Sequence, residues 1–350
     1  MGFPGKVPSS VSLPFGSRRM NQTSTDRRTF LGRAAAATGA AAIAGSVSAP
    51  QSHAEPKAAL GPSHPVRLGG PVFDAPADPE GMALAHRKLG YRAAYCPNVR
   101  LSEPEKIRDV AAAFKKHDVV IAEVGRWVNL LDADPAKREA NLKAVTEGLA
   151  LAEAVGARCC VDIAGSYNPK SWFGPHPDNL TRKFFDAAVQ NARKIIDAVN
   201  PKRAKFCYEM MGWAFPDSAR SYLQMIKAVD RDAFGVHLDP CNAINSPERF
   251  YRNADLLNEC FDKLGPWIAS CHAKDLTWDV EMNVHFREVT IGTGTLDYAT
   301  YLKRLAALPG DVPLMIEHMA DAEEYDKSRR YLLDLGSKIG VRFNLGSGRD

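Results

Sequence analysis

From residue 66 onward the chain alternates short apolar segments with helical patterns, and this alternation restricts its fold more than any other feature. The apolar segments have the length of buried strands and are bounded by Gly, Pro or polar residues. Strands are therefore predicted over residues 66–72, 91–96, 119–124, 158–163, 204–209, 234–239, 268–272 and 312–317. Helices are predicted after them, over residues 79–89, 103–117, 137–155, 180–199, 218–229, 254–264, 298–308 and 323–339.

Eight consecutive strand-helix units predict an α/β fold, the closed (β/α)8 TIM barrel. An open, doubly wound sheet is the alternative, but no Gly-rich phosphate-binding turn follows the first predicted strand. The 350 residues, 45% of them hydrophobic, suffice for one large core. Since nothing in the sequence resembles a linker between two domains, a single barrel domain is predicted over residues 55–350.

Four predicted strands in the second half of the chain each end in a residue that can bind a metal ion. These residues are Glu209, Asp239, His272 and Glu317. The C-terminal ends of parallel barrel strands lie on one face, so the four side chains are predicted to converge there. Taken singly, such a carboxylate can instead cap the next helix, and such a histidine can be a core residue.

Four such residues at matching positions favour a shared metal, because charged groups gathered in a barrel mouth must be paired or metal-bound. The set is mostly oxygen, which suits Mn²⁺, Mg²⁺ or Co²⁺ better than a structural zinc site. Mn²⁺ is the expected ion, with Mg²⁺, Co²⁺ or Zn²⁺ as alternatives.

Residues 1–54 are predicted to comprise a disordered N-terminus and an export signal. Residues 1–19 are rich in Pro, Ser and Gly, and Met20 is an alternative start. The pair Arg27-Arg28, followed by Phe30-Leu31 and an Ala-rich run, resembles a twin-arginine signal closely. The expected partner during export is therefore the twin-arginine (Tat) translocase, and the expected location is the periplasm or the cell exterior.

The Ala-rich run over residues 34–49 is shorter than the roughly 20 residues that a membrane-spanning helix needs. No stable membrane span is therefore expected, and cleavage is predicted after Ala49 or Ala54. Folded proteins leave by the twin-arginine route, which suits an enzyme that takes up its metal before export.

The formal charge of +4 comes from the N-terminus, because the first 54 residues hold six Lys or Arg and one acid. The rest of the chain has 39 basic and 40 acidic residues. This balance argues against a nucleic-acid partner, since nucleic-acid surfaces carry a basic excess.

The cysteines lie mostly in apolar, strand-like segments, and their number is odd. Buried free cysteine behaves as a small hydrophobic residue, and no C-x-x-C pair is present. We expect structural thiols at Cys96, Cys159, Cys160, Cys207, Cys241, Cys260 and Cys271.

Beyond single residues, a succession of motifs accompanies the predicted ligands. They are Tyr208-Glu209, His237-Leu238-Asp239-Pro240, Cys271-His272-Ala273-Lys274-Asp275, Gly292-Thr293-Gly294-Thr295-Leu296-Asp297-Tyr298 and Met315-Ile316-Glu317-His318. Over about residues 66–340 this succession resembles the sugar isomerase/epimerase family with the xylose-isomerase-like TIM barrel. The resemblance specifies the family better than the substrate.

The resemblance to ketose 3-epimerases implies that Glu209 and Glu317 both bind the metal and form the proton-transfer pair. Asp239 and His272 are then ligands only. The chain departs from these epimerases at Asn242, where they have a histidine. Asparagine can hydrogen-bond a hydroxyl but cannot shuttle a proton, which weakens a direct transfer of the ketose-epimerase reaction.

Four residues are predicted to bind substrate: His237, Asn242, Lys274 and Arg287. His237 lies two residues before Asp239 and so shares its face of the strand. Lys274 can polarise a carbonyl or an oxyanion, with Asp275 as its pairing partner. Arg287 stands about where the resembled epimerases keep an arginine that contacts substrate, although a solvent-facing arginine is an equal alternative.

Further candidates at strand ends are acidic or aromatic. Glu123 and Trp127 follow the third predicted strand and are candidates for lining the pocket, whereas Trp172 and Trp213 can stack on a sugar ring. Large aromatic residues more often belong to the hydrophobic core than to a surface on which a sugar stacks.

The leading hypothesis is a metal-dependent enzyme that removes a proton next to a sugar carbonyl, giving isomerisation or epimerisation through an enediolate. A 3-keto-glycoside lyase or hydratase, acting by β-elimination on the same metal site, is the alternative. An abasic-site endonuclease of the same fold is disfavoured by the near-neutral body and the export signal. A non-catalytic carbohydrate-binding barrel is the alternative outside enzymology, and relatives suggest a homo-oligomer.

Overall fold

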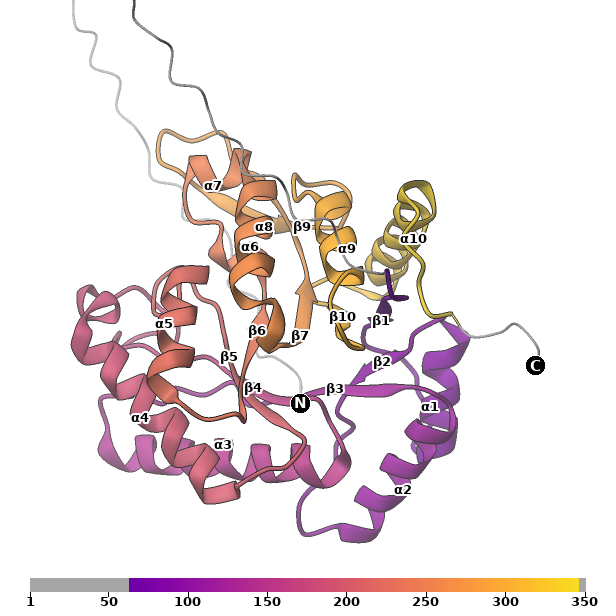
Figure 1. Cartoon of the computed structure of the whole chain (residues 1–350), viewed down its shortest axis with the longest axis horizontal. Coiled ribbons are helices and arrows are strands. Elements are labelled where there is room, and N and C mark those ends of the chain that lie inside the picture. Colours follow the sequence, from indigo (N-terminus) through magenta and orange to yellow (C-terminus); the bar gives the residue numbers. More distant parts are fainter. Residues whose placement is uncertain (1–62, 346–350) are drawn as a thin grey trace, which may run out of the picture. The chain divides into compact units, whose positions relative to one another are not determined.

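The computed structural model describes residues 63–345, which contain a closed barrel of eight parallel strands surrounded by helices (Figure 1). The predicted (β/α)8 barrel is confirmed. The order of strands around the barrel is β1-β10-β7-β6-β5-β4-β3-β2. Their bounds are β1 Arg67–Gly69, β2 Ala93–Tyr95, β3 Val120–Gly125, β4 Cys159–Asp162, β5 Lys205–Glu209, β6 Phe234–Leu238, β7 Ile268–Ala273 and β10 Pro313–Ile316.

The long helices follow the strands in the predicted order. They are α1 Pro79–Lys88, α2 Pro104–Lys116, α3 Pro135–Val155, α4 Arg182–Val199, α5 Ala219–Val229, α8 Asn253–Leu264, α9 Tyr298–Ala306 and α10 Ala322–Ile339. Short helical turns lie in the connections: η1 Pro177–Leu180, α6 Pro240–Ala243, α7 Pro247–Tyr251 and η2 Gly265–Trp267. None of the helices in residues 63–345 combines the length and apolar character needed to cross a membrane.

Local sequence explains where these helices begin and end. In α3 the carboxylate of Asp134 accepts the backbone N–H of Ala136 at 2.8 Å, and Pro135 occupies the first helical position. The helix ends at Gly156, whose φ of 78° is left-handed. The predicted helix over 180–199 starts later, at Arg182, because Leu180 belongs to η1 and Thr181 is the cap.

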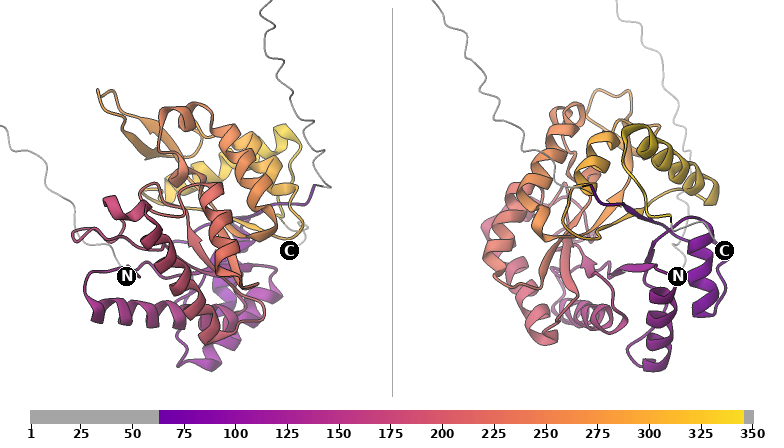
Figure 2. Two further views of the ribbon diagram at one scale, coloured as in Figure 1. Left: turned by 60° about the vertical axis from the view of Figure 1, so that its left-hand side comes forward. Right: turned by 45° about the vertical axis from the view of Figure 1, so that its right-hand side comes forward.

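One element was not predicted: an antiparallel hairpin in the connection between β7 and α9. Its strands are β8 Asp275–Trp278 and β9 Phe286–Val289. The tip of the hairpin is open to solvent, since Val280 is 90% and Met282 100% exposed. Figure 2 shows this segment, coloured orange, standing away from the barrel.

The helices bury their apolar faces against the outside of the barrel, where most of the hydrophobic core lies. A small separate cluster of Ala93, Ala122 and Met315, with Tyr95 beside it, packs apart from this outer core. All seven cysteines are free thiols, and all but Cys96 are buried. The predicted domain boundary at residue 55 and the predicted export signal lie outside the described residues.

A register shift in β3 has consequences for the site. Ala94 pairs with Ile121, but Tyr95 pairs with Glu123, so Ala122 is an extra residue in β3. Such a β-bulge bends a strand and re-aims the side chains that follow it. The side chain of Glu123 contacts residues of β6 and β7 across the barrel, so it points into the interior.

Candidate metal centre

The structure brings together the four predicted ligands at the C-terminal ends of their strands. Glu209, Asp239, His272 and Glu317 each offer a ligand atom, and these atoms lie within 4.8 Å of one another. Nδ1 of His272 is 2.8 Å from Oε2 of Glu317, 3.0 Å from Oε1 of Glu209 and 3.7 Å from Oδ2 of Asp239. The side chain of Glu317 is 17% exposed, whereas those of Asp239 and His272 are fully buried, so the group opens to solvent beside Glu317.

Asp239 caps a helix and also faces the metal-ligand group. Its Oδ1 accepts the backbone N–H of Cys241 at 3.0 Å and of Asn242 at 3.3 Å, which caps α6. Its Oδ2 is 2.8 Å from Nζ of Lys274. The two interpretations of a strand-end carboxylate, cap and ligand, therefore apply to different oxygens of one residue.

The residues present fit a divalent cation. Three carboxylates face one lysine, so positive charge is in short supply within a buried group. Oδ2 of Asp239 and Oε2 of Glu317 are buried without a hydrogen bond of acceptable geometry among residues 63–345. Both oxygens lie 2.8 to 3.2 Å from Lys274 or His272, but three buried carboxylates remain together, and a hard cation bound by carboxylates and one imidazole would stabilise them.

The pKa directions describe the same imbalance. Burial raises the pKa of Glu209. Burial alone would also raise the pKa of Glu317, but His272 and Lys274 lower it to about 2. For His272, burial would lower the pKa, but Glu317 and Glu123 raise it well above its usual range. An ion that binds at Nδ1 of His272 must displace any proton on that nitrogen.

Lys274 and Asn242, both predicted to bind substrate, lie against the ligand group. Nζ of Lys274 is 3.2 Å from Oε2 of Glu317 and donates to Oδ1 of Asn242 at 3.3 Å. Lys274 is also 3.6 Å from the carboxylate of Glu288. Burial would lower the pKa of Lys274, but Asp239 and Glu317 raise it well above its usual range, so the lysine is a fixed positive charge.

Asp275 does not pair with Lys274, which corrects the expectation from sequence. Its carboxylate instead accepts backbone N–H groups of Gly292 and Gly294 at 2.9 and 3.0 Å, and of Leu296 at 3.0 Å. A Cβ at Gly294 would lie 2.3 Å from Oδ1 of Asp275, so only glycine fits. The Gly-Thr-Gly motif is therefore a turn built around a structural carboxylate.

His237 lies below the ligand group rather than on its open side. It is fully buried, and its ring lies 4.1 Å from that of His272 at 82° between the planes. Its Nε2 is 2.9 Å from Oε2 of Glu123. Its Nδ1 is 4.0 Å from Oε1 of Glu209 and has no hydrogen-bond partner in the described residues.

Glu123 was expected to line the pocket, but the structure buries it to 1% exposure beneath the ligand group. Its Oε1 is 3.1 Å from Nε2 of His272, and its Oε2 accepts the hydroxyl of Ser270 at 3.0 Å. Glu123 could be singled out from sequence as an acid near a strand end. No sequence pattern identifies the β-bulge in β3 that turns the Glu123 side chain inward.

The structure does not bring Arg287 to the ligand group. Its Nε is 2.7 Å from Oδ1 of Asp279, within the hairpin, and its side chain is 56% exposed. Its neighbour Glu288 instead reaches Lys274 and, at 2.8 Å, Nδ1 of His318. Neighbouring strand residues point to opposite faces, so Arg287 faces away from the site. Glu288 was missed because the hairpin was not predicted.

The three candidate tryptophans lie in loops that follow the C-terminal ends of β3, β4 and β5. Trp127, Trp172 and Trp213 are 39%, 37% and 60% exposed. Loops at these positions lie on the same side of a TIM barrel as the strand-end residues. These tryptophans are therefore on the correct side of the molecule, and their indole rings are accessible.

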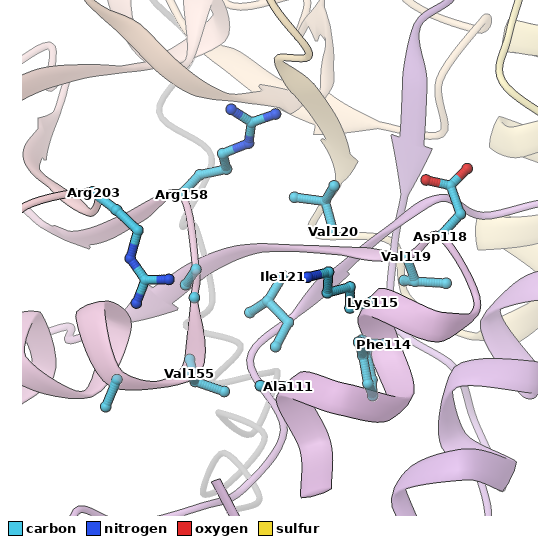
Figure 3. Close-up of a pocket in the computed structure, with 13 residues that line it drawn as sticks. Ala111, Phe114, Lys115, Asp118, Val119, Val120, Ile121, Val155, Arg158 and Arg203 are labelled. Carbon is cyan, nitrogen blue, oxygen red and sulfur yellow. The ribbon is translucent and has the colours of Figure 1, made fainter. Parts of the chain in front are cut away.

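A cavity of about 550 Å³ lies at the opposite, N-terminal end of the barrel strands. Figure 3 shows Lys115 and Asp118 on one side of it and Arg158 and Arg203 on the other. Asp118 already pairs with Arg67 at 2.7 Å, and Arg158 donates to the carbonyl of Asp311 at 2.8 Å. This cavity holds no convergent set of metal ligands, so the chemistry is assigned to the other end.

The described residues therefore form a closed TIM barrel with a candidate metal centre at its C-terminal end. Three carboxylates and one histidine make up this centre. The chain belongs to the xylose isomerase-like TIM barrel family, whose sequence pattern matches residues 84–335. No curated protein matches the chain.

Several solved structures share the fold. A xylose isomerase-like TIM barrel protein from Mycobacterium smegmatis, in complex with magnesium, is 19% identical, with a TM-score of 0.55 over 79% of this chain and 98% of that one. D-psicose 3-epimerase from Clostridium cellulolyticum H10, with D-tagatose, is 15% identical, with a TM-score of 0.56 over 80% and 99%. The 3-keto-D-glucoside 4-epimerase of E. coli is 14% identical, with a TM-score of 0.53 over 77% and 99%.

Proposed function

We propose that the protein is a divalent-metal-dependent sugar isomerase or epimerase that removes a proton next to a sugar carbonyl and passes through an enediolate. One observation carries the proposal: Glu209 and Glu317 lie 3.0 and 2.8 Å from the same histidine nitrogen. They come from β5 and β10, which are not neighbours in the barrel. Two carboxylates that reach one point from different sides can remove a proton and return it on another face.

In this proposal Glu209, Asp239, His272 and Glu317 hold the ion. When bound, a divalent ion lowers the free-energy cost of negative charge on a sugar carbonyl and the neighbouring hydroxyl. Mn²⁺ is proposed, with Mg²⁺, Co²⁺ and Zn²⁺ as alternatives. The mostly oxygen donor set supports a hard cation.

The other residues near the ligand group position the substrate and stabilise charge. The ammonium of Lys274 is a fixed cation that can stabilise a developing oxyanion. Asn242, which already bonds Lys274, can accept or donate a hydrogen bond to a sugar hydroxyl but cannot carry a proton. Proton transfer is therefore assigned to Glu209 and Glu317 alone.

The alternative reaction at the same site is β-elimination from a 3-keto-glycoside. It begins with the same proton removal and then expels a leaving group from the adjacent carbon. The fold shared with a 3-keto-D-glucoside 4-epimerase supports a keto-glycoside substrate. Asn242, in place of the histidine of ketose epimerases, supports a departure from the ketose reaction.

The alternative from another class is a carbohydrate-binding barrel without activity. It would have no use for three buried carboxylates around one histidine, because such a group is costly without a cation. The metal content of the purified protein separates the two. A binding barrel should contain no stoichiometric metal, whereas the proposed enzyme should.

We also propose that the protein is exported by the twin-arginine route and meets free or glycosidic sugars in the periplasm or outside the cell. The paired arginines and the weakly apolar run before residue 50 support this. A homo-oligomer is part of the proposal by analogy with relatives. Fractionation of cells that carry an Arg27→Lys, Arg28→Lys double variant tests the route, since export should stop.

The experiment that tests the reaction is incubation of the Mn²⁺-loaded protein in D₂O with free ketoses and with 3-keto-glycosides, followed by NMR. Deuterium on carbon of an intact, rearranged sugar is the result expected for an isomerase or epimerase. Release of the aglycone, with an unsaturated or hydrated keto-sugar, would establish the lyase instead. Absence of both deuterium exchange and products with either substrate class would count against the proposal.

A further inference from the structure

A buried carboxylate connects the two histidines beneath the ligand group. Glu123 has one oxygen 3.1 Å from Nε2 of His272 and the other 2.9 Å from Nε2 of His237. Ser270 donates its hydroxyl to the second oxygen at 3.0 Å. Glu123 is 1% exposed and the other three residues are fully buried, so the network is closed to water.

The direction of the hydrogen bonds follows from this geometry. Each oxygen of the Glu123 carboxylate lies at hydrogen-bond distance from Nε2 of a different histidine. An ionised carboxylate accepts hydrogen bonds and donates none. Both histidines must therefore carry a proton on Nε2 to bond it.

These hydrogen bonds at Nε2 determine whether Nδ1 of each histidine carries a proton or a lone pair. A neutral imidazole with its proton on Nε2 has a lone pair on Nδ1. In neutral His272 that lone pair would face Glu209, Asp239 and Glu317, where a bound cation would take the place of a proton on Nδ1. In His237 the same lone pair lies 4.0 Å from Oε1 of Glu209.

We propose that Glu123 is a positioning residue of the metal centre, which holds His272 in the tautomer whose Nδ1 binds the ion and holds His237 in the same tautomer beside it. Carboxylates that bond the far nitrogen of a metal-binding histidine fix the ring and strengthen it as a ligand. The inference rests on the proposed function only in that a divalent ion binds at this centre. Glu123 itself touches neither ion nor substrate.

The competing arrangement is a second ion held by Glu123, His237 and His272, whose donor atoms also lie within 4.8 Å of one another. Separations of 2.9 to 3.1 Å between nitrogen and oxygen are those of hydrogen bonds. The hydroxyl of Ser270 takes up a further acceptor site on Glu123. We therefore infer hydrogen bonds at Glu123, and the number of ions bound per wild-type chain tests this choice.

The test is Glu123→Gln, which keeps the shape but replaces one acceptor oxygen with an NH₂ donor. A glutamine cannot accept from both histidines at once, so one ring must turn its lone pair to Nε2 and its proton to Nδ1. Titration calorimetry with Mg²⁺ and with Mn²⁺ should show the dissociation constant weakened by about 10- to 100-fold. Long-range ¹H–¹⁵N NMR of the Mg²⁺-loaded protein should show one histidine changed to the Nδ1–H form.

Two further variants make the result specific. Ser270→Ala removes a donor to Glu123 but leaves its carboxylate free to accept from both rings, so the dissociation constant should change less than about fivefold, the size of one ordinary hydrogen bond. Glu123→Asp keeps the acceptor-only chemistry with a shorter reach. It should preserve the Nε2–H form of both rings even where affinity falls, and it replaces Glu123→Gln if that variant does not fold.

The outcomes separate this inference from the proposed function. Unaltered affinity and unaltered tautomers in Glu123→Gln, with one ion bound by the wild type, would overturn the positioning role alone. Two ions per wild-type chain would make Glu123 a ligand and would also overturn it. A wild type that binds neither Mg²⁺ nor Mn²⁺ would overturn the metal centre and this inference together.

Discussion

The two ends of the barrel both carry charged clusters, but these differ in burial and in how their charges are paired. At the N-terminal end, Arg67 forms ion pairs with Asp118 and Asp311, and Arg158 lies 3.6 Å from the same Asp311. At the C-terminal end, three carboxylates share one lysine and one histidine, and two buried oxygens lack hydrogen bonds. Partly exposed ion pairs lie at the N-terminal end, whereas buried carboxylates form a candidate metal site at the C-terminal end.

The cavity of about 550 Å³ belongs to the N-terminal end, away from the candidate metal centre. A hollow alone therefore does not locate the chemistry of this protein. The arrangement of titratable groups is the better guide to a candidate site, because perturbed carboxylates and histidines cluster at functional sites.

The largest expected effect is on turnover at the C-terminal end. Glu209→Gln and Glu317→Gln should each lower kcat by about 10²–10⁴-fold, the contribution of a general acid or base. Both variants should keep the unfolding temperature of the wild type in chelator, because each change removes one of several like charges. The NMR assay measures turnover and thermal unfolding measures the fold.

Glu288→Gln is the matched control for these two variants. Its carboxylate is 3.6 Å from Lys274 but lies outside the ligand group, so the loss should stay below about tenfold, the effect of one charge contact. Full activity in either Glu209→Gln or Glu317→Gln would remove the proton-transfer pair from the proposal.

Metal binding should stabilise the protein through the C-terminal end only. Mn²⁺ at 100 times its dissociation constant should add about 2.7 kcal/mol to the free energy of unfolding, and chelator should reverse the gain. Asp239→Asn should remove most of this gain because it deletes a ligand, whereas Arg67→Met should retain it. Thermal unfolding with and without Mn²⁺ measures this stabilisation. If both variants lose it equally, the two ends do not differ in metal binding.

At the N-terminal end, Arg67→Met should lower the free energy of unfolding by about 2 kcal/mol, less than a fully buried pair costs because both aspartates are partly exposed. The side chain of Arg67 is 10% exposed, and those of Asp118 and Asp311 are 51% and 40% exposed. Urea denaturation measures the loss. Turnover should not change, and a fall of more than tenfold would show that this end also serves the reaction.

The smallest effect is expected at the hairpin. Arg287→Ala should change the free energy of unfolding by less than about 0.5 kcal/mol, because exposed ion pairs contribute little. The value of kcat/KM should change less than about threefold, as for a surface substitution away from the site. A drop in kcat/KM beyond tenfold would restore the substrate contact that the resemblance to epimerases implies.

The convergence of the four candidate ligands could be predicted because each of them ends an apolar segment of the sequence. Each of Glu209, Asp239, His272 and Glu317 ends an apolar segment, and parallel strands in a closed barrel leave those ends on one face. Arg287 could not be placed in this way. The hairpin that carries it is an insertion whose facing direction depends on where its two strands pair.

By itself, the sequence determined the barrel and the convergence of four ligands, because both follow from the period of apolar segments and the common direction of the strands. Tertiary structure decided what lies beneath and beside those ligands. The bulge at Ala122 turned Glu123 toward two histidines from distant strands, and backbone N–H groups of a remote turn took the carboxylate of Asp275. These contacts depend on which side chains the closed barrel brings together, because a buried charge without a partner costs free energy.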